Sequence, residues 1–206
     1  MLLTTAYFPP IEYFALLAKY SVVYMEACEN YQKQSYRNRC RILTANGVEA
    51  LNVPVVHENG TFSLPIKKIR VDYSTPWVLR TERAIESAYS SSPFFLYYRD
   101  AIFAILDSHP ATLWELNRRI IDFFCAKIGI APEIRETFDF VPAGTDGGDY
   151  RPVIHPKRPN NIMRDLGLER PYWQVFQDKF GFVPGLSIMD LLFNEGPESI
   201  CLLRCP

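Results

Sequence analysis

Acids, amides, phenols and cations are concentrated between residues 26 and 41. Arg37, Arg39 and Arg41 stand at every second position, so on a strand their guanidinium groups lie on one face and can bind a phosphate or carboxylate through paired hydrogen bonds. We predict that Glu26 transfers a proton in a catalytic step. The predicted ligand-binding residues are Asn30, Tyr31, Lys33, Tyr36, Arg37, Asn38, Arg39 and Arg41. The alternative is an edge strand whose solvated charges discourage aggregation, and the residues alone leave both interpretations open.

A second group of polar residues lies in a long loop near residues 132–170. Its members are Asp146, Asp149, Tyr150, Arg151, His155, Lys157 and Arg158. A loop of this length in a compact chain is usually functional or disordered. It could close over a ligand and bring His155 to it as a catalytic general acid or base. A mobile surface loop is the alternative.

Known chemical fingerprints are missing from the chain. We find no GxGxxG, GxxxxGK[ST], HExxH, CxxC or GxSxG motif, so nucleotide, zinc and hydrolase sites have no motif support. The three histidines are scattered, and we predict no metal site and leave the cofactor unknown. The five cysteines are odd in number and lack paired spacing, which favours free thiols in a reducing compartment.

Composition limits the class of protein. The chain has 206 residues, 48% apolar and 22% charged, which is typical of a globular protein and excludes disorder as the main state. Its 22 Lys and Arg residues against 23 Asp and Glu make nucleic acid an improbable partner. We expect no membrane span and no signal peptide, because no apolar run approaches about 20 residues, and we therefore predict a cytoplasmic protein.

The elements that position the polar clusters begin with an α/β pattern. The sequence predicts a strand over 2–6, a helix over 11–20 and a strand over 21–27, with the two strands parallel. Asn46-Gly47 lies between two strand-like stretches and predicts an antiparallel hairpin in which Ala45 pairs with Val48. In this register Cys40 and Ile42 share an apolar face, while the arginines occupy the other face. A further strand is predicted over 66–73.

Helical spacing dominates after residue 75. We predict helices over 75–90, 93–107, 112–130, 171–180 and 187–194. In the last of these, Asp190 lies among apolar residues, where a lone acid often faces water. The predicted fold class is α/β: an N-terminal mixed β-sheet with an Asn-Gly hairpin, followed by a mainly helical C-terminal half. We expect a single domain over 1–206, strand-rich over 1–74 and mainly helical over 75–206.

Several segments, in chain order, resemble the WbqC-like family of bacterial proteins. They are TAYFPPIEYFALL (5–17), ENYQKQSYRNRCRI (29–42), NGVEALNVPV (46–55) and PFFLYY (93–98). The closing SIMDLLFNEGPES (187–199) is similar to the Bacteroidetes-type branch. The sequence departs from the family pattern where a Gln-Pro pair is replaced by Thr4 and Thr5, and where a histidine is replaced by Thr81. If that Gln or His is catalytic in relatives, this chain uses another group or has lost activity.

The resemblance implies a role in O-antigen-like surface polysaccharide biosynthesis. We therefore expect a transferase or modifying enzyme that acts on an activated sugar or on an acyl or aminoacyl donor. Its expected partner is a small anionic or sugar substrate, with a polysaccharide-assembly protein as a further partner. A non-catalytic ligand-binding or assembly protein remains the alternative.

Overall fold

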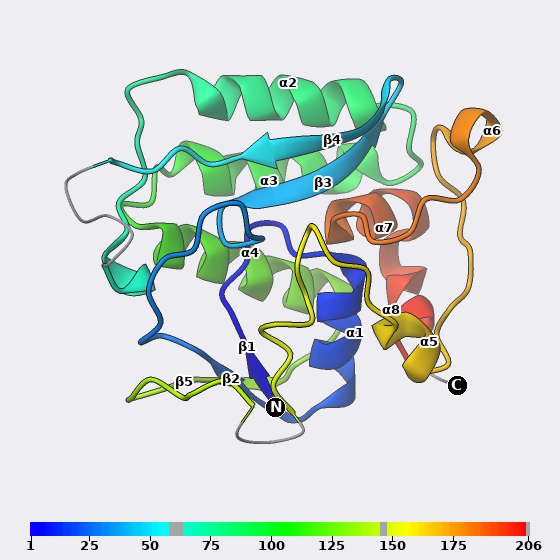
Figure 1. Ribbon diagram of the computed structural model, residues 1–206. Helices are drawn as coiled ribbons and strands as arrows, with labels where there is room; N and C mark the ends of the chain where they lie inside the picture. Colours follow the sequence, from blue (N-terminus) through cyan, green and yellow to red (C-terminus); the bar gives the residue numbers. More distant parts are fainter. Residues whose placement is uncertain (58–63, 145–147, 205–206) are drawn as a thin grey trace.

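The computed structural model describes residues 1–57, 64–144 and 148–204 (Figure 1). Three short strands form a parallel sheet in the order β1-β2-β5, namely β1 (Leu2–Leu3), β2 (Val22–Met25) and β5 (Glu133–Glu136). The predicted parallel pairing of β1 with β2 is confirmed, with Leu2 opposite Tyr24. β5 pairs with the other edge of β2, although its residues lie where the sequence predicted a loop.

Helix α1 (Ile11–Lys19) connects β1 to β2 and lies within the core. Every side chain from Ile11 to Leu17 is buried, including the carboxylate of Glu12. Such a helix must satisfy its polar groups inside the protein, because water does not reach them. Glu12 is therefore the residue of α1 whose surroundings matter for chemistry.

A hairpin of β3 (Arg39–Thr44) and β4 (Gly47–Asn52) forms the second sheet. The predicted register is wrong by two residues, because Thr44 pairs with Gly47 and the turn consists of Ala45 and Asn46. Gly47 has a φ of 107°, which glycine adopts without strain, and the Thr44 hydroxyl closes the turn by donating to the Gly47 carbonyl at 3.0 Å. A shift of two residues preserves the faces, so the core-facing residues are those predicted, Cys40 and Ile42.

The predicted strand over 66–73 is absent. Residues Ile66–Lys68 instead form a 3-10 turn, η2, and only isolated bridges follow, from Val71 to Val55 and from Arg70 to Thr112. Pro65 begins the turn and has no backbone N–H to continue a ladder.

Three long helices make up the middle of the chain, as predicted: α2 (Trp77–Tyr89), α3 (Phe95–Asp107) and α4 (Leu113–Ile128). The Thr112 hydroxyl caps α4 by accepting from the Glu115 amide at 3.2 Å, and Gly129 ends α4 in the left-handed conformation. In Figure 1 the hairpin runs along these helices, and β3 packs against α2.

The C-terminal part consists of short helices. These are α5 (Ile162–Asp165), α6 (Gln177–Phe180), α7 (Ile188–Glu195), the 3-10 turn η3 (Gly196–Glu198) and α8 (Ser199–Leu203). The predicted helix over 171–180 is confined to α6, because Tyr172 and Gln174 bond instead to Asp190 of α7. Asp190 is 1% exposed, so the expectation that it faces water is wrong.

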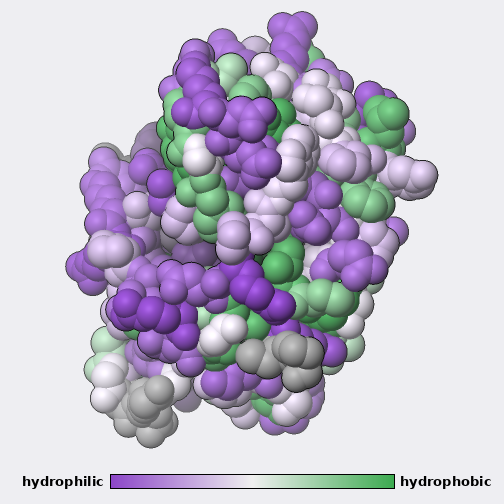
Figure 2. All heavy atoms as spheres, turned by 90° about the vertical axis from the view of Figure 1, so that its right-hand side faces the viewer, coloured by the Kyte–Doolittle hydropathy of each residue, from purple (hydrophilic) through white to green (hydrophobic). Residues whose placement is uncertain are grey.

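The predicted fold class is confirmed: parallel and antiparallel strands occur together with a helical C-terminal half. In the parts of the chain that the structure describes, none of the helices has the length and apolar character needed to cross a membrane. The face shown in Figure 2 is mainly hydrophilic, and its hydrophobic residues form separate patches.

Candidate anion-binding site

Arg37 lies just before β3 and is part of a buried ion pair. Its Nε and Nη2 atoms donate to the two carboxylate oxygens of Glu29 at 2.8 and 2.5 Å, and both side chains are 5% exposed. Asn117 of α4 donates to the Arg37 carbonyl at 2.8 Å. Burial raises the pKa of Glu29, and the Arg37 guanidinium opposes that rise. Arg37 is thus held by an internal partner.

Arg39 and Arg41 lie on the other face of β3 from Cys40 and Ile42, and both are partly exposed. The Arg39 Nε atom is buried and has no hydrogen-bond partner among the described residues. A buried guanidinium N–H without an acceptor is costly, and an anion would relieve it. Arg41 lies beside Tyr36 and Glu12 and influences the pKa of both.

The segment around His155 packs onto the residues that precede β3. The Lys157 ammonium donates to the Gln34 side-chain carbonyl, and the Lys157 amide donates to His155 Nδ1 at 3.2 Å. Burial lowers the pKa of His155, and the cations Arg158, Lys157, Arg37 and Arg39 lower it further. The imidazole is therefore neutral at pH 7 with Nδ1 as acceptor, which leaves Nε2–H as a donor.

Glu12 adds a carboxylate that the sequence analysis missed. Asn160 donates to Glu12 Oε1 at 3.1 Å, and burial raises the pKa of Glu12 while Arg41 opposes the rise. Gly185 borders the same place, since a Cβ built on it would lie 3.8 Å from both Arg41 Nη1 and Glu12 Oε1. A buried carboxyl group with a raised pKa holds a proton more readily than an exposed one, which suits a general acid or base.

These contacts define what we call the anion site. It is formed by β3, by α1 and by the segment 155–160, and its members are Glu12, Tyr36, Arg39, Arg41, His155, Lys157, Arg158 and Asn160. Four permanent cations against one carboxyl group of raised pKa give it a positive field. The structure thus brings the predicted His155 and two predicted arginines together.

Glu26 does not belong to the anion site. It follows the carboxyl end of β2. Its Oε1 accepts from the Cys28 amide at 2.9 Å and from the Thr137 hydroxyl at 2.7 Å. Its Oε2 accepts from the Val141 amide at 3.0 Å and from Arg151 Nη1 at 2.9 Å. Glu26 is fully buried with both oxygens occupied, which favours a role in holding the loop over the predicted role in catalysis.

The other predicted ligand-binding residues fall into two groups. Asn30 and Lys33 are exposed, and Asn38 donates its amide to the Val53 carbonyl at 3.0 Å. Tyr31 and Tyr36 are 4% and 5% exposed, and burial raises the pKa of Tyr36 to about 12. Buried phenols offer little ring surface for stacking on a ligand. Asp146 of the predicted loop cluster lies outside the described residues.

The positions that depart from the family pattern are interior. Thr5 is fully buried with an unbonded hydroxyl, and Thr81 is 4% exposed beside the buried Tyr7. The Thr4 carbonyl accepts from the Tyr13 hydroxyl at 2.8 Å. Across residues 1–57, 64–144 and 148–204, no three His, Cys, Asp or Glu side chains are placed to hold a metal ion.

Comparison with known proteins assigns the chain to a protein family. A family model described as the WbqC-like protein family matches residues 5–169, without distinguishing a branch. The chain is also similar to Rv1507c, an uncharacterised protein of Mycobacterium tuberculosis, with 29% identity over 224 residues that cover 96% of this chain and 94% of that protein. No solved structure matches the chain significantly.

Proposed function

This chain belongs to the WbqC-like protein family, and from that premise we propose that it is a transferase or modifying enzyme of bacterial surface polysaccharide biosynthesis. Its substrate is an activated sugar, or an acyl or aminoacyl donor, that carries phosphate. Two observations support this most directly. The Arg39 Nε atom is buried without an acceptor among the described residues, and Arg39 lies close enough to His155, from a distant segment, to lower its pKa.

The geometry suggests a division of labour in the transfer step. Arg39 and Arg41 hold the phosphate, since charge-assisted contacts from arginine suit its geometry, and His155 Nε2–H adds a donor. Glu12 accepts the proton of the attacking hydroxyl or amine as that atom bonds to the transferred group. In the same step the transferred group's bond to its leaving group breaks, which is the sugar–phosphate bond of a nucleotide sugar or the thioester bond of an acyl-coenzyme A. The leaving group departs with its electron pair, and the two arginines hold the charge of the phosphate that it carries.

We propose a cytoplasmic location for this reaction. Cys28, Cys40, Cys125 and Cys201, the cysteines within the described residues, form no disulfide. Free thiols are typical of a reducing compartment.

The first experiment is calorimetric titration of the protein with UDP-N-acetylglucosamine, acetyl-coenzyme A and ADP, each with and without Mg²⁺. We expect one donor class to bind, and Arg39→Ala to weaken binding by about 10- to 100-fold, because a hydrogen bond to a charged group contributes about 1.5–3 kcal/mol. Arg135→Ala is the matched control, since Arg135 is an exposed arginine paired with Glu133 on β5. Unchanged affinity in folded Arg39→Ala would exclude Arg39 as the phosphate ligand.

A non-catalytic binding protein remains the second candidate. It is favoured by the fact that Arg37 and Glu26, two residues of the predicted cluster, are fully engaged in internal ion pairs. Turnover of the bound donor with a pH-dependent rate supports the enzyme, whereas tight binding without product supports the alternative.

A further inference from the structure

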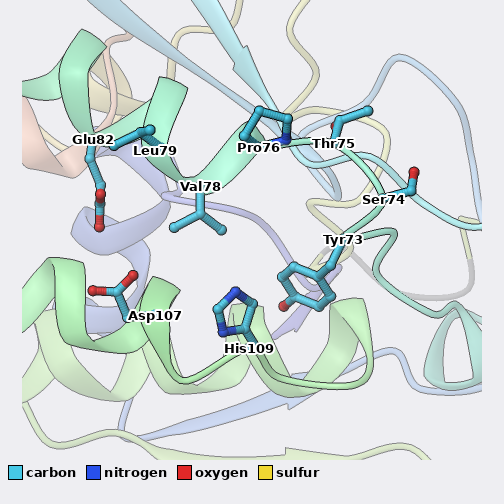
Figure 3. Close-up of a pocket in the computed structure, with 9 residues that line it drawn as sticks. All are labelled: Tyr73, Ser74, Thr75, Pro76, Val78, Leu79, Glu82, Asp107 and His109. Atoms are coloured by element: carbon cyan, nitrogen blue, oxygen red, sulfur yellow. The ribbon is translucent and has the colours of Figure 1, made fainter.

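A hollow lies between the start of α2 and the connection from α3 to α4 (Figure 3). Its volume of about 520 Å³ lies within the range of small-molecule sites. The lining residues are Tyr73, Ser74, Thr75, Pro76, Val78, Leu79, Glu82, Asp107 and His109. None of them belongs to the anion site, and we call this hollow the acidic pocket.

One end of the acidic pocket carries two carboxylates. Figure 3 shows Glu82 of α2 and Asp107 of α3 pointing toward each other. Glu82 Oε1 is shielded from water and has no hydrogen-bond donor among the described residues. Burial raises the pKa of Glu82, and the charges of Asp107 and Glu86 raise it further. Among the described residues, the charges that act on the pKa of Glu82 are therefore negative, and its Oε1 atom has no donor.

Asp107 adds to the negative field because of its place in the chain. It is the last residue of α3, where the helix dipole is negative and a carboxylate is unfavourable. Arg119 comes close enough to lower the pKa of Tyr73, but its guanidinium donates to Glu115 and Ser108. A cation supplied from outside would offset the charge of Asp107 at the end of α3 and the charge of Glu82 on α2.

The opposite end is aromatic and rigid. The Tyr73 ring stacks on Trp77 with centroids 5.7 Å apart and meets His109 edge-on at 4.6 Å. Its hydroxyl donates to the Pro110 carbonyl at 2.9 Å, so the ring cannot turn away. Val78 points into the space between this wall and the acids (Figure 3). The pocket thus offers carboxylates at one end and apolar and aromatic surface beside them.

We propose that the acidic pocket binds a small organic molecule with a primary ammonium group. The ammonium group donates to Glu82 Oε1 and to Asp107, and the apolar body lies against Val78 and the Tyr73 ring. An ammonium has three donors and suits two carboxylates, whereas no third metal-ligating group converges here among the described residues. The nearby aromatic ring adds attraction for a cation. This site is separate from the anion site, which has the opposite charge.

The test is a titration of the intact protein with 2-phenylethylamine, followed by calorimetry or by protein NMR, with 2-phenylethanol as the neutral analogue. We expect the amine to bind at least tenfold more tightly than the alcohol and to shift the resonances of Tyr73 and Val78. Glu82→Gln should weaken amine binding at least tenfold, because it removes the negative charge and retains the size of the side chain.

Two further variants keep the result decisive. Asp107 is exposed at a helix end, so Asp107→Asn should fold normally and should also weaken amine binding. Asp100 is on the same helix but forms an ion pair with Arg99 outside the pocket, so Asp100→Asn should leave the amine affinity unchanged. Arg39→Ala should also leave it unchanged, which separates this inference from the proposed function. Equal binding of amine and alcohol, or unchanged amine affinity in Asp107→Asn, would overturn the proposal.

Discussion

Two arginines, one just before β3 and one at its start, have different roles. Arg37 and Arg39 are two positions apart, yet Arg37 forms a buried pair with Glu29, while Arg39 has a buried nitrogen for which the described part of the chain supplies no acceptor. A buried pair is costly to break, because removing one partner leaves the other charge unsatisfied. We therefore expect substitutions at Arg37 to act on stability and substitutions at Arg39 to act on ligand binding.

Glu12→Gln tests the proton acceptor of the proposed reaction. We expect the rate of transfer to fall by about 10²- to 10⁴-fold, the usual contribution of general acid–base catalysis. Donor affinity should stay within a few fold, because glutamine retains the size of the side chain and an oxygen that accepts from Asn160. Steady-state kinetics and calorimetric titration of the same preparation measure the two effects.

The pH dependence of the transfer rate is an independent test of Glu12 as the proton acceptor. The pKa of Glu12 is raised by burial, and a general base acts in its deprotonated form, so the wild-type rate should rise with pH through that raised pKa. This rise should be absent from the residual activity of Glu12→Gln. Exposed Glu133→Gln on β5 is the control and should keep the full profile. A Glu12→Gln variant with wild-type rate and profile would assign the proton transfer to another group.

At the scale of elements, one ion-pair network fastens a long loop to the parallel sheet. Arg151 bonds to Glu26 at 2.9 Å and to Asp149 at 2.7 Å, and all three side chains are at most 8% exposed. Glu26 follows β2 directly, and two of its other donors, Thr137 and Val141, follow β5. The loop that leads on to His155 is thus tied to the carboxyl ends of two neighbouring strands.

Arg151→Met should destabilise the protein by about 3–5 kcal/mol, because it leaves Glu26 buried without its cation. Denaturation in urea measures the change, and hydrogen exchange should show faster exchange at Val141. Arg135→Met is the control, since its exposed, solvent-screened pair with Glu133 should contribute little to stability. Equal effects of the two substitutions would contradict the network. If Arg151→Met does not fold, Glu26→Gln provides the same comparison with a smaller change.

The elements show which features a sequence can specify locally. Helices α2 to α4 were predicted because each carries a repeating apolar face, and α4 also has Thr112 at its start and Gly129 at its end. Strand β5 was missed because its residues, Glu133–Glu136, are mostly charged and it forms only by pairing with β2, more than a hundred residues earlier. The hairpin register was wrong because Gly47 begins β4 and is not part of the turn.

The anion site, like the fold, was predicted only where a local sequence pattern indicates it. Alternating arginines on a strand indicated an anion-binding face, and His155 was recognised as a candidate within its loop. The approach of residues 155–160 to β3 depends on tertiary contacts that no local pattern encodes. Glu12 was missed because an acid in an apolar helix usually faces water, and its burial becomes visible only when Arg41 and Asn160 are placed beside it.

At the scale of the whole molecule, a buried polar network joins the C-terminal segment to the core. Asp190 Oδ2 accepts from the Tyr172 hydroxyl at 2.5 Å and from the Gln174 amide at 2.9 Å. Gln174 also donates to the Val183 carbonyl and accepts from the Val183 amide. Burial raises the pKa of Asp190 to about 6 from 3.8, while its hydrogen bonds oppose that rise.

This pKa links the global stability of the protein to pH. Between pH 3.8 and about 6 the folded state holds a proton on Asp190 that the unfolded state has lost, so the free energy of unfolding should fall as pH rises. A shift of about two units corresponds to a loss of roughly 3 kcal/mol across that window. Asp190→Asn should remove this part of the slope, and urea denaturation at pH 4, 5, 6 and 7 measures it. Parallel curves for the two proteins would show that Asp190 does not titrate in this range.

The order in which the parallel sheet is assembled has a consequence for biosynthesis. Val22 of the central strand pairs with Glu133, so one edge of that strand has no partner until well over a hundred further residues have left the ribosome. Contacts so distant in sequence close slowly, and an unpaired strand edge invites intermolecular pairing in the meantime. We therefore expect nascent chains that end before residue 133 to aggregate or to need a chaperone, and chains that extend past residue 136 to become resistant to protease.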